Sequence, residues 1–329
     1  MKLLYPSPLQ SGDTLMVIAP SSPSTYVREH VMQTAKQRFD DLGLHAVFAP
    51  NFHSDLFIGT PESIKQRVDD IHTAFADKTV KGIFTILGGY HCNQLLDLLD
   101  FDLIKNNPKV FCGFSDITAL NNAILAQTGL VTFCGPHYSS FGMLHGFDFT
   151  MDAFKKAIMH EDDFDISVST EWSDDPWYRD QDNRTFIKNA GAPVMHTGAA
   201  HGNLIGGNLS TFALLQGTKY MPSDFDDIVL FVEDDSESSE DTFIRQLNGV
   251  LMQDFANKIR GVLVGRFQKE TNPNTLTIYQ TIKNRLPNVP VIMDLDFGHT
   301  TPLLTIPTGA WCEINASDNN FEITISRKG

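Results

Sequence analysis

One serine lies where an apolar stretch gives way to a helical pattern, and its type suits either structure or chemistry. The stretch VFC, residues 110–112, runs into Gly113-Phe114-Ser115-Asp116. A serine that begins a helix usually caps it, because its oxygen accepts a free backbone N–H. A strand–turn–helix with serine at the turn is also the geometry of a nucleophile elbow, which projects Oγ from the sheet. The elbow motif normally ends in glycine, whereas residue 117 is Ile. This stretch alone leaves Ser115 as a cap or a nucleophile.

A serine nucleophile needs a base and a group that orients the base. His299 directly follows a glycine after an apolar stretch, and its alternative role is that of an ordinary hydrogen-bonded loop histidine. Glu233 is the first acid after the apolar stretch in IVLFVEDD, and its alternative role is in a solvated turn that caps the next helix. The acidic run does not have the spacing of an EF-hand loop, so we predict no metal site.

A glycine pair, Gly88-Gly89, follows a third apolar stretch. Glycines let a backbone approach a ligand closely and leave N–H groups free to donate. Such a turn can hold a phosphate or supply a donor to an oxyanion hole. The full G-x-G-x-x-G pattern and the Walker lysine are both missing here, which favours the oxyanion interpretation.

The elements that must position these residues alternate between strand and helix over the first 140 residues. We expect strands at 14–20, 44–50, 82–87 and 109–114, and helices at 26–42, at 60–77, from about 93, and after Ser115. Apolar strands separated by helices predict a parallel sheet that is covered on both faces. Ligands bind such sheets beyond the carboxyl ends of the strands, where the glycine pair and Ser115 both lie.

The remainder predicts a second α/β unit with a β-rich end. The segment EWSDDPWYRDQDNRTF, residues 171–186, is polar and aromatic without a period, which indicates a long loop or linker. From residue 202 onward we expect helices at 208–216, 242–252 and 275–285, and strands at 228–232, 261–264, 290–294, 310–314 and 321–325. The predicted fold class is therefore α/β, with a doubly wound parallel-sheet domain over 1–145, a linker and aromatic loop over 146–200, and a C-terminal α/β domain over 201–329. The active site is expected in the cleft between the domains.

Composition argues against several classes of function. The 329 residues are 42% hydrophobic and 20% charged, which is typical of a soluble globular protein. The net charge of −15, without a Lys/Arg cluster, disfavours nucleic acid as a partner. No apolar run is long enough for a membrane span or a signal peptide. The four cysteines show no C-x-x-C spacing, so we expect reduced thiols in a cytoplasmic protein.

Six blocks of sequence together resemble the LD-carboxypeptidase family of serine peptidases. They are LGGYHCNQLLDLLDFD, CGFSDITALNNAIL, GLVTFCGP, GNLIGGNLSTFALLQGT, LFVEDD and LDFGHTTPLLTIPTGA, in the family's order and across nearly the whole chain. The resemblance implies a catalytic triad of Ser115, Glu233 and His299, which favours the nucleophile over the cap. It also implies an oxyanion hole from backbone amides near Gly89 and at Asp116, no cofactor, and a homodimer that acts on a small-molecule or peptide substrate.

The blocks are most similar to the microcin C immunity branch, whose members cut the amide between an aminoacyl group and a sulfamoyl or phosphoramidate nucleotide. The other branch trims the terminal D-alanine from murein tetrapeptides. In the immunity branch a loop aromatic stacks on the base, which implies Trp177 here, with Trp172 as second choice. The alternative is that either side chain only anchors the loop. Asn208 and Tyr90 are further substrate contacts that the resemblance implies. A non-catalytic peptide- or nucleotide-binding protein is the remaining alternative.

Overall fold

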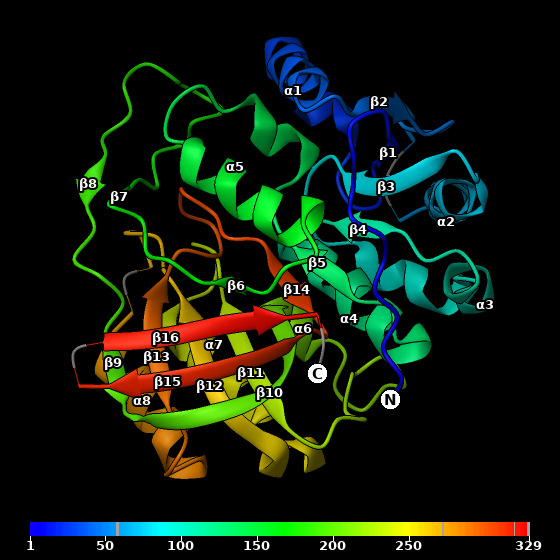
Figure 1. The fold of residues 1–329 in the computed structure, drawn as a ribbon. Coiled ribbons are helices and arrows are strands. Elements are labelled where there is room, and N and C mark those ends of the chain that lie inside the picture. Colours follow the sequence, from blue (N-terminus) through cyan, green and yellow to red (C-terminus); the bar gives the residue numbers. More distant parts are fainter. Residues whose placement is uncertain (57–58, 272, 319, 328–329) are drawn as a thin grey trace.

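The computed structural model describes residues 1–56, 59–271, 273–318 and 320–327, and it contains two large sheets (Figure 1). In the first sheet the strands follow the order β14-β5-β4-β3-β1-β2. Strands β1 to β5 are parallel to their neighbours, and β14 pairs antiparallel with β5. The strands are β1 (Thr14–Ile18), β2 (His45–Phe48), β3 (Val80–Thr85), β4 (Val110–Cys112), β5 (Thr132–Cys134) and β14 (Ile306–Thr308).

Helices α1 (Glu29–Asp41), α2 (Pro61–Ala76), α3 (Phe101–Lys105) and α4 (Thr118–Thr128) connect these strands. Helix α2 begins where the sequence predicts, because Thr60 accepts a hydrogen bond from the Ser63 amide at 3.2 Å and proline is the first helical residue. Every residue of β4 and β5 is buried, as expected of strands in the middle of a parallel sheet.

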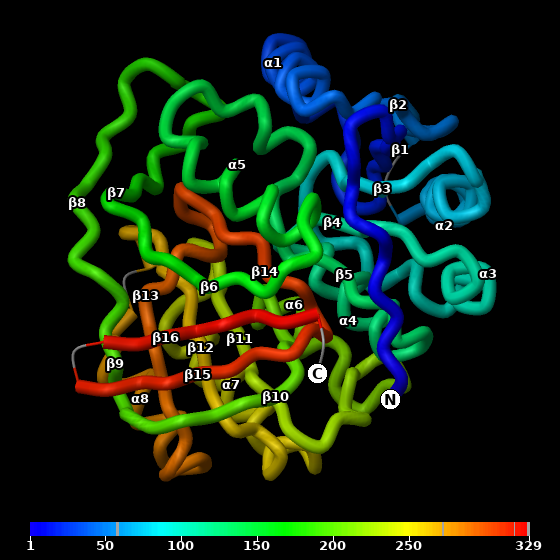
Figure 2. Tube along the Cα trace, viewed as in Figure 1, coloured from blue at the N-terminus to red at the C-terminus, as the bar shows by residue number. Residues whose placement is uncertain are grey.

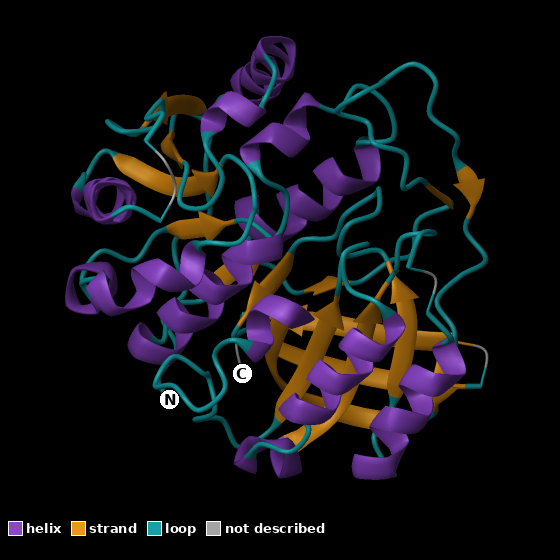
Figure 3. Cartoon of the chain, turned by 180° about the vertical axis from the view of Figure 1, so that it is seen from behind, coloured by secondary structure: helices purple, strands orange, loops and turns teal. Residues whose placement is uncertain are grey.

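The second sheet has the order β6-β16-β15-β10-β11-β12-β13-β9, with β10 to β13 parallel and the outer strands antiparallel. Its strands are β6 (Phe164–Asp165), β9 (Val194–His196), β10 (Gly198–Asn208), β11 (Ile228–Glu233), β12 (Ile259–Gly265), β13 (Val291–Leu295), β15 (Trp311–Ser317) and β16 (Asn320–Ser326). Helices α6 (Leu209–Ala213), α7 (Glu240–Val250) and α8 (Thr275–Arg285) lie over one face of this sheet (Figure 3).

The side-chain alternation of β11 shows why this sheet is apolar on both faces. Leu230 and Val232 belong to the same buried cluster as Phe243 of α7. Val229 and Phe231 point the other way, into a cluster that includes Ile314 and Ile323 of β15 and β16. A strand buried on both faces must be continuously apolar, as the sequence IVLFV is.

The prediction for 146–200 is wrong over part of this stretch. Helix α5 (Asp148–Phe154) continues into one π-helical turn, Lys155–Met159, before the short hairpin of β7 (Glu171–Trp172) and β8 (Ile187–Lys188) (Figure 2). The helix forms because Phe154 packs against the rings of Phe39 and Phe84, from distant parts of the chain, and against that of Phe141, which lies just before the helix. The stretch 171–186 outside β7 is irregular, as predicted.

The helix predicted from about residue 93 is also different. The chain forms a 3₁₀ helix over Cys92–Leu98 and then restarts as the short α3. The break arises because Asp100 caps a new helix, accepting a hydrogen bond from the Leu103 amide at 2.8 Å. Strand β14, between the predicted C-terminal elements, was not predicted at all. The mixed α/β class, with a parallel sheet first and a second sheet after it, is confirmed. None of the described helices is long and apolar enough to cross a membrane.

Candidate active site

Ser115 lies directly beyond the carboxyl end of β4 in a backbone conformation that few non-glycine residues adopt. Its φ is 60°, in the left-handed region. This geometry turns the chain sharply from β4 into a 3₁₀ turn, Ser115–Ile117, and then into α4. The N-cap residues of these two helices are Phe114 and Ile117, and Ser115 Oγ instead contacts His299. The cap alternative is therefore wrong, and Oγ points elsewhere.

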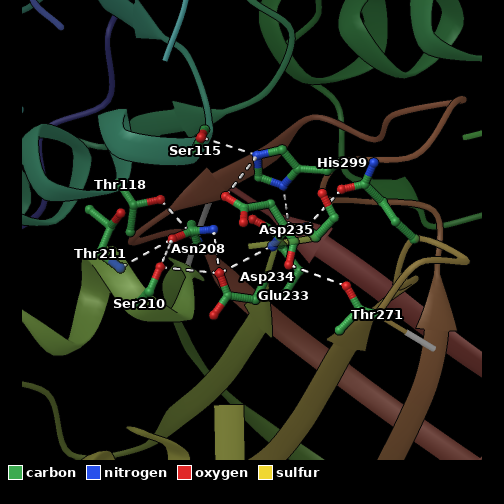
Figure 4. A network of polar contacts seen from close by, with 12 residues as sticks. Ser115, Thr118, Asn208, Ser210, Thr211, Glu233, Asp234, Asp235, Thr271 and His299 are labelled. Carbon is green, nitrogen blue, oxygen red and sulfur yellow. Dashed lines mark hydrogen bonds and ion pairs between the residues drawn. The ribbon is translucent and has the colours of Figure 1, made fainter. Parts of the chain in front are cut away.

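His299 and Glu233 complete a line of contacts from Ser115 (Figure 4). His299 Nε2 lies 3.1 Å from Ser115 Oγ, and His299 Nδ1 lies 2.8 Å from Glu233 Oε2. Glu233 ends β11 and is 1% exposed, while His299 lies in the loop after β13. Gly298 makes the approach possible, because a Cβ there would lie 2.6 Å from Glu233 Oε2. The structure thus brings together the three residues that the sequence proposed.

The electrostatics of His299 favour its charged form. Burial alone would lower its pKa, but the Glu233 carboxylate beside Nδ1 opposes this, and with Asp235 and Asp234 it raises the pKa to about 9. The Asp235 carboxylate lies 3.9 Å from His299 Nε2. An imidazole held between carboxylates is well suited to carry a proton temporarily.

Asn208 has a structural position beneath these residues (Figure 4). Its Oδ1 caps α6 by accepting a hydrogen bond from the Thr211 amide, and it also accepts one from the Ser210 hydroxyl. Its Nδ2 donates to Asp234 Oδ1 at 3.0 Å. Asn208 is buried and does not line the cavity described below. Burial raises the pKa of Asp234 to about 6, with added repulsion from Glu233 and Asp235.

Gly88, the first residue of the glycine pair, packs directly against Ser115. A Cβ on Gly88 would lie 2.8 Å from Ser115 Cβ and 2.9 Å from Oγ, so a larger residue would displace the serine. Gly89 has φ 145°, and a Cβ there would lie 2.4 Å from Ser22 Oγ. Both positions need glycine, one to leave space at Ser115 and the other to make the turn.

Asp116 holds this turn in place through its side chain. Its buried Oδ2 accepts hydrogen bonds from the His91 amide at 2.7 Å, the Cys92 amide at 2.9 Å and the Ser21 hydroxyl at 2.5 Å. The sequence points only to the backbone amide of Asp116 and gives no sign of this role. A carboxylate bonded to amides of a loop distant in sequence has no local signature.

A cavity of about 350 Å³ opens beside His299. Trp177 lines the cavity. Trp172 instead packs against two cations: Arg266 Cζ lies 5.0 Å and Lys269 Nζ 5.6 Å from the centroid of its ring. Tyr90 is 63% exposed and does not line the cavity; its phenol lies next to the Glu237 carboxylate, which raises the Tyr90 pKa. Apart from His299, the charged residues among the described lining are acidic, and none is lysine or arginine: Asp174, Asp175, Asp235 and Glu237.

His137 is a lining residue that the sequence analysis did not single out, although it ends the sequence FCGPH after β5. It is 2% exposed and its ring lies 4.4 Å from that of Phe114. Across the described ranges of the chain, no group of three or more His, Cys, Asp or Glu is arranged to hold a metal ion.

Comparison with known proteins matches two family models: an LD-carboxypeptidase N-terminal domain over residues 15–135 and an LD-carboxypeptidase C-terminal domain over residues 201–314. A Treponema pallidum protein named "Putative carboxypeptidase" is 43% identical over 93% of this chain and 91% of its own. The Escherichia coli microcin C7 self-immunity protein MccF is 30% identical over 98% of this chain and 96% of its own.

Two solved structures share the fold. An MccF-like protein from Bacillus anthracis has a TM-score of 0.94 at 43% identity, covering 98% of this chain and 99% of its own. MccF in complex with glutamyl sulfamoyl guanosine has a TM-score of 0.87 at 28% identity, covering 98% of each chain.

Proposed function

The chain belongs to the LD-carboxypeptidase family, and from the geometry of its site we propose that it is a serine hydrolase that cleaves an amide bond. One observation carries the proposal: the continuous line of contacts from Ser115 Oγ through His299 to Glu233, at 3.1 and 2.8 Å, beside a cavity. Contacts of this length and order are those of a nucleophile, its base and the group that orients the base.

In this mechanism neutral His299 takes the proton of Ser115 as Oγ attacks the substrate carbonyl carbon. Glu233 keeps the imidazole oriented and stabilises the imidazolium. The amides of Gly89 and Asp116 donate to the oxyanion, each worth about 3 kcal/mol in the transition state. His299 then protonates the leaving nitrogen as the C–N bond breaks. Water hydrolyses the acyl-serine ester by the same proton transfers in reverse, which releases the acid and restores Ser115.

We propose aminoacyl nucleotides, joined through a sulfamoyl or phosphoramidate amide, as the substrate class. Trp177 supports this choice, since an indole in the cavity wall offers a stacking surface to a base. The relative MccF binds glutamyl sulfamoyl guanosine and aspartyl sulfamoyl adenosine. A carboxypeptidase must also bind the substrate's terminal carboxylate; the lining of this cavity includes no lysine or arginine, whereas Arg28 and Arg179 line a second cavity that shares Trp177 and Tyr178 with it.

Release of D-alanine from a murein tetrapeptide is the second candidate. The observation that favours it is the 43% identity to a relative named as a carboxypeptidase. The two candidates share Ser115, His299 and Glu233 and differ only in what fills the cavity.

The test is to incubate purified protein with aspartyl and alanyl sulfamoyl adenosine and, separately, with a murein tetrapeptide. We expect hydrolysis of a nucleotide compound and no release of D-alanine. Ser115→Ala should abolish turnover and remain folded by circular dichroism. Release of D-alanine alone would replace the substrate proposal with the second candidate. Retained turnover in Ser115→Ala would refute the assignment of the nucleophile. Absence of turnover, together with absence of serine labelling by a fluorophosphonate in the wild type, would favour a non-catalytic binding protein.

A further inference from the structure

A second cavity, of about 500 Å³, adjoins the one beside His299. The two cavities have four lining residues in common: Leu87, Ser139, Trp177 and Tyr178. Tyr178 is 52% exposed, so part of the boundary between the cavities is open to solvent. A ligand can therefore extend across this boundary from one cavity into the other without displacing buried groups.

Two arginines line the second cavity, and none of its described lining residues is acidic. Arg28 immediately precedes α1, and Arg179 lies in the irregular stretch 171–186, so the fold brings these cations together from segments far apart in the sequence. Arg179 Cζ lies 5.7 Å from the centroid of the Tyr178 ring. This contact places the guanidinium of Arg179 at the boundary with the first cavity.

Both guanidinium groups keep their N–H donors free. In the described part of the chain, that of Arg28 makes no hydrogen bond or ion pair, and that of Arg179 contacts only the ring of Tyr178. The neighbouring acids are bonded elsewhere: Glu29 Oε1 accepts a hydrogen bond within α1 at 3.1 Å, and Asp180 Oδ2 accepts one from the side-chain amide three residues later at 2.9 Å. An arginine with free donors matches the oxygens of a phosphate or carboxylate.

The two cavities carry opposite charges. Apart from His299, the charged residues that line the first cavity are acidic, whereas those of the second are the two arginines. A substrate that spans both is bound best when one of its ends is cationic or neutral and the other is anionic. The amine of an aminoacyl group suits the first cavity, so the second is left for the part of the substrate on the other side of the scissile bond.

We propose that the second cavity is a subsite for an anionic group on the leaving part of the substrate, and that Arg28 and Arg179 are its specificity-determining residues. The inference rests on the proposed function, in which the base of the leaving part contacts Trp177 in the wall that the two cavities share. The anionic group is a phosphate if the leaving part is a nucleotide, and a terminal carboxylate if it is the last residue of a peptide. Arginine binds both through the same donors.

The experiment measures binding by isothermal titration calorimetry to Ser115→Ala, which cannot turn the ligands over. One pair of ligands is alanyl sulfamoyl adenosine with and without a 3′-phosphate. The other pair is a murein tetrapeptide and the same peptide with its terminal carboxylate converted to an amide. We expect the anionic member of the nucleotide pair to bind about tenfold or more tightly than its partner, the range of a hydrogen bond to a charged group.

The double replacement Arg28→Gln and Arg179→Gln in the same background should bring the two affinities within about threefold of each other. Arg285→Gln is the matched control, because Arg285 is exposed in the last turn of α8 and lines neither cavity, and it should keep the full preference. Circular dichroism checks that each variant is folded.

The outcomes separate this inference from the proposed function. A preference for the free carboxylate that appears only in the peptide pair and is lost with the two arginines would support the subsite, while the proposed nucleotide substrate fails. No preference for the anion in either pair, or a preference that survives in the double variant, would overturn the subsite whatever the enzyme cleaves.

Discussion

Replacement of Gly88 by alanine tests how closely the site is packed around Ser115. A new Cβ would lie 2.8 Å from Ser115 Cβ, whereas carbon atoms in contact are about 3.5–4.0 Å apart. Relief of the overlap requires the two Cβ atoms to move apart by about 1 Å. Rotation of the Ser115 hydroxyl does not relieve it, because that rotation leaves Ser115 Cβ in place. No left-handed backbone conformation is required at Gly88, so alanine itself is permitted there.

The displacement should break the 3.1 Å contact between Ser115 Oγ and His299 Nε2. A misplacement of about 1 Å in an active site costs about 10²-fold in rate, or about 2.7 kcal/mol of transition-state stabilisation. Overpacking also lowers the free energy of unfolding by about 1–3 kcal/mol. We therefore expect Gly88→Ala to fold and to lose about 99% of its turnover.

The assay is the rate of serine labelling by a fluorophosphonate together with kcat/KM on the substrate, below the thermal midpoint found by circular dichroism. Gly249→Ala is the matched control, because Gly249 lies inside α7 and a Cβ there would come no closer than 3.4 Å to Gln216. That variant should keep wild-type rates. A Gly88→Ala protein with labelling within about threefold of the wild type would refute the argument that Gly88 maintains the position of Ser115.

Three further predictions concern pH, the loop aromatics and the support of the glycine turn. Because only neutral His299 can accept the serine proton, kcat/KM of the wild type should rise with pH up to about 9. In Glu233→Gln this rise should occur at lower pH, and the maximal rate should fall roughly 10⁴-fold. A pH–rate profile of both proteins measures the two effects. Trp177→Ala should raise KM for a sulfamoyl adenosine substrate by about tenfold, within the range for loss of one stacked base, whereas Trp172→Ala should leave KM unchanged in the same kinetic assay. Asp116→Ala should lower the free energy of unfolding by about 3 kcal/mol in urea, since it leaves buried donors without an acceptor, while the exposed Asp162→Ala should have no effect.

Each of these has an opposing result. An unchanged pH profile in Glu233→Gln would mean that Glu233 does not set the pKa of His299. A larger rise of KM in Trp172→Ala than in Trp177→Ala would reverse the assignment of the stacking residue. Equal unfolding curves for Asp116→Ala and Asp162→Ala would show that the contacts of Asp116 add nothing to stability.

Local patterns were enough to predict most of the elements, whereas the choice of Ser115, Glu233 and His299 as a triad needed the resemblance to the family. Apolar runs predicted the parallel strands except β5 and β10, and Thr60 with Pro61 predicted the start of α2, because caps and burial on both faces leave marks within a few residues. The serine, the glutamate and the histidine became candidates because each follows an apolar strand, where parallel sheets bind ligands, but the patterns alone left a structural role open for each. Helix α5 was missed although Met151, Phe154 and Ile158 have helical spacing, because polar residues around that stretch obscured the pattern.

Contacts between distant residues were decided by the tertiary structure alone. Ser115 and His299 are 184 positions apart, and only the arrangement of the two sheets brings them within 3.1 Å. The same is true of the carboxylate of Asp116, of His137 with Nδ1 2.7 Å from Thr85 Oγ1, and of Trp177 reaching the cavity where Trp172 does not. The physical reason is that caps and periodicity act within a few residues, whereas burial, pKa and hydrogen-bond partners depend on which segments the packing of the strands and helices brings together.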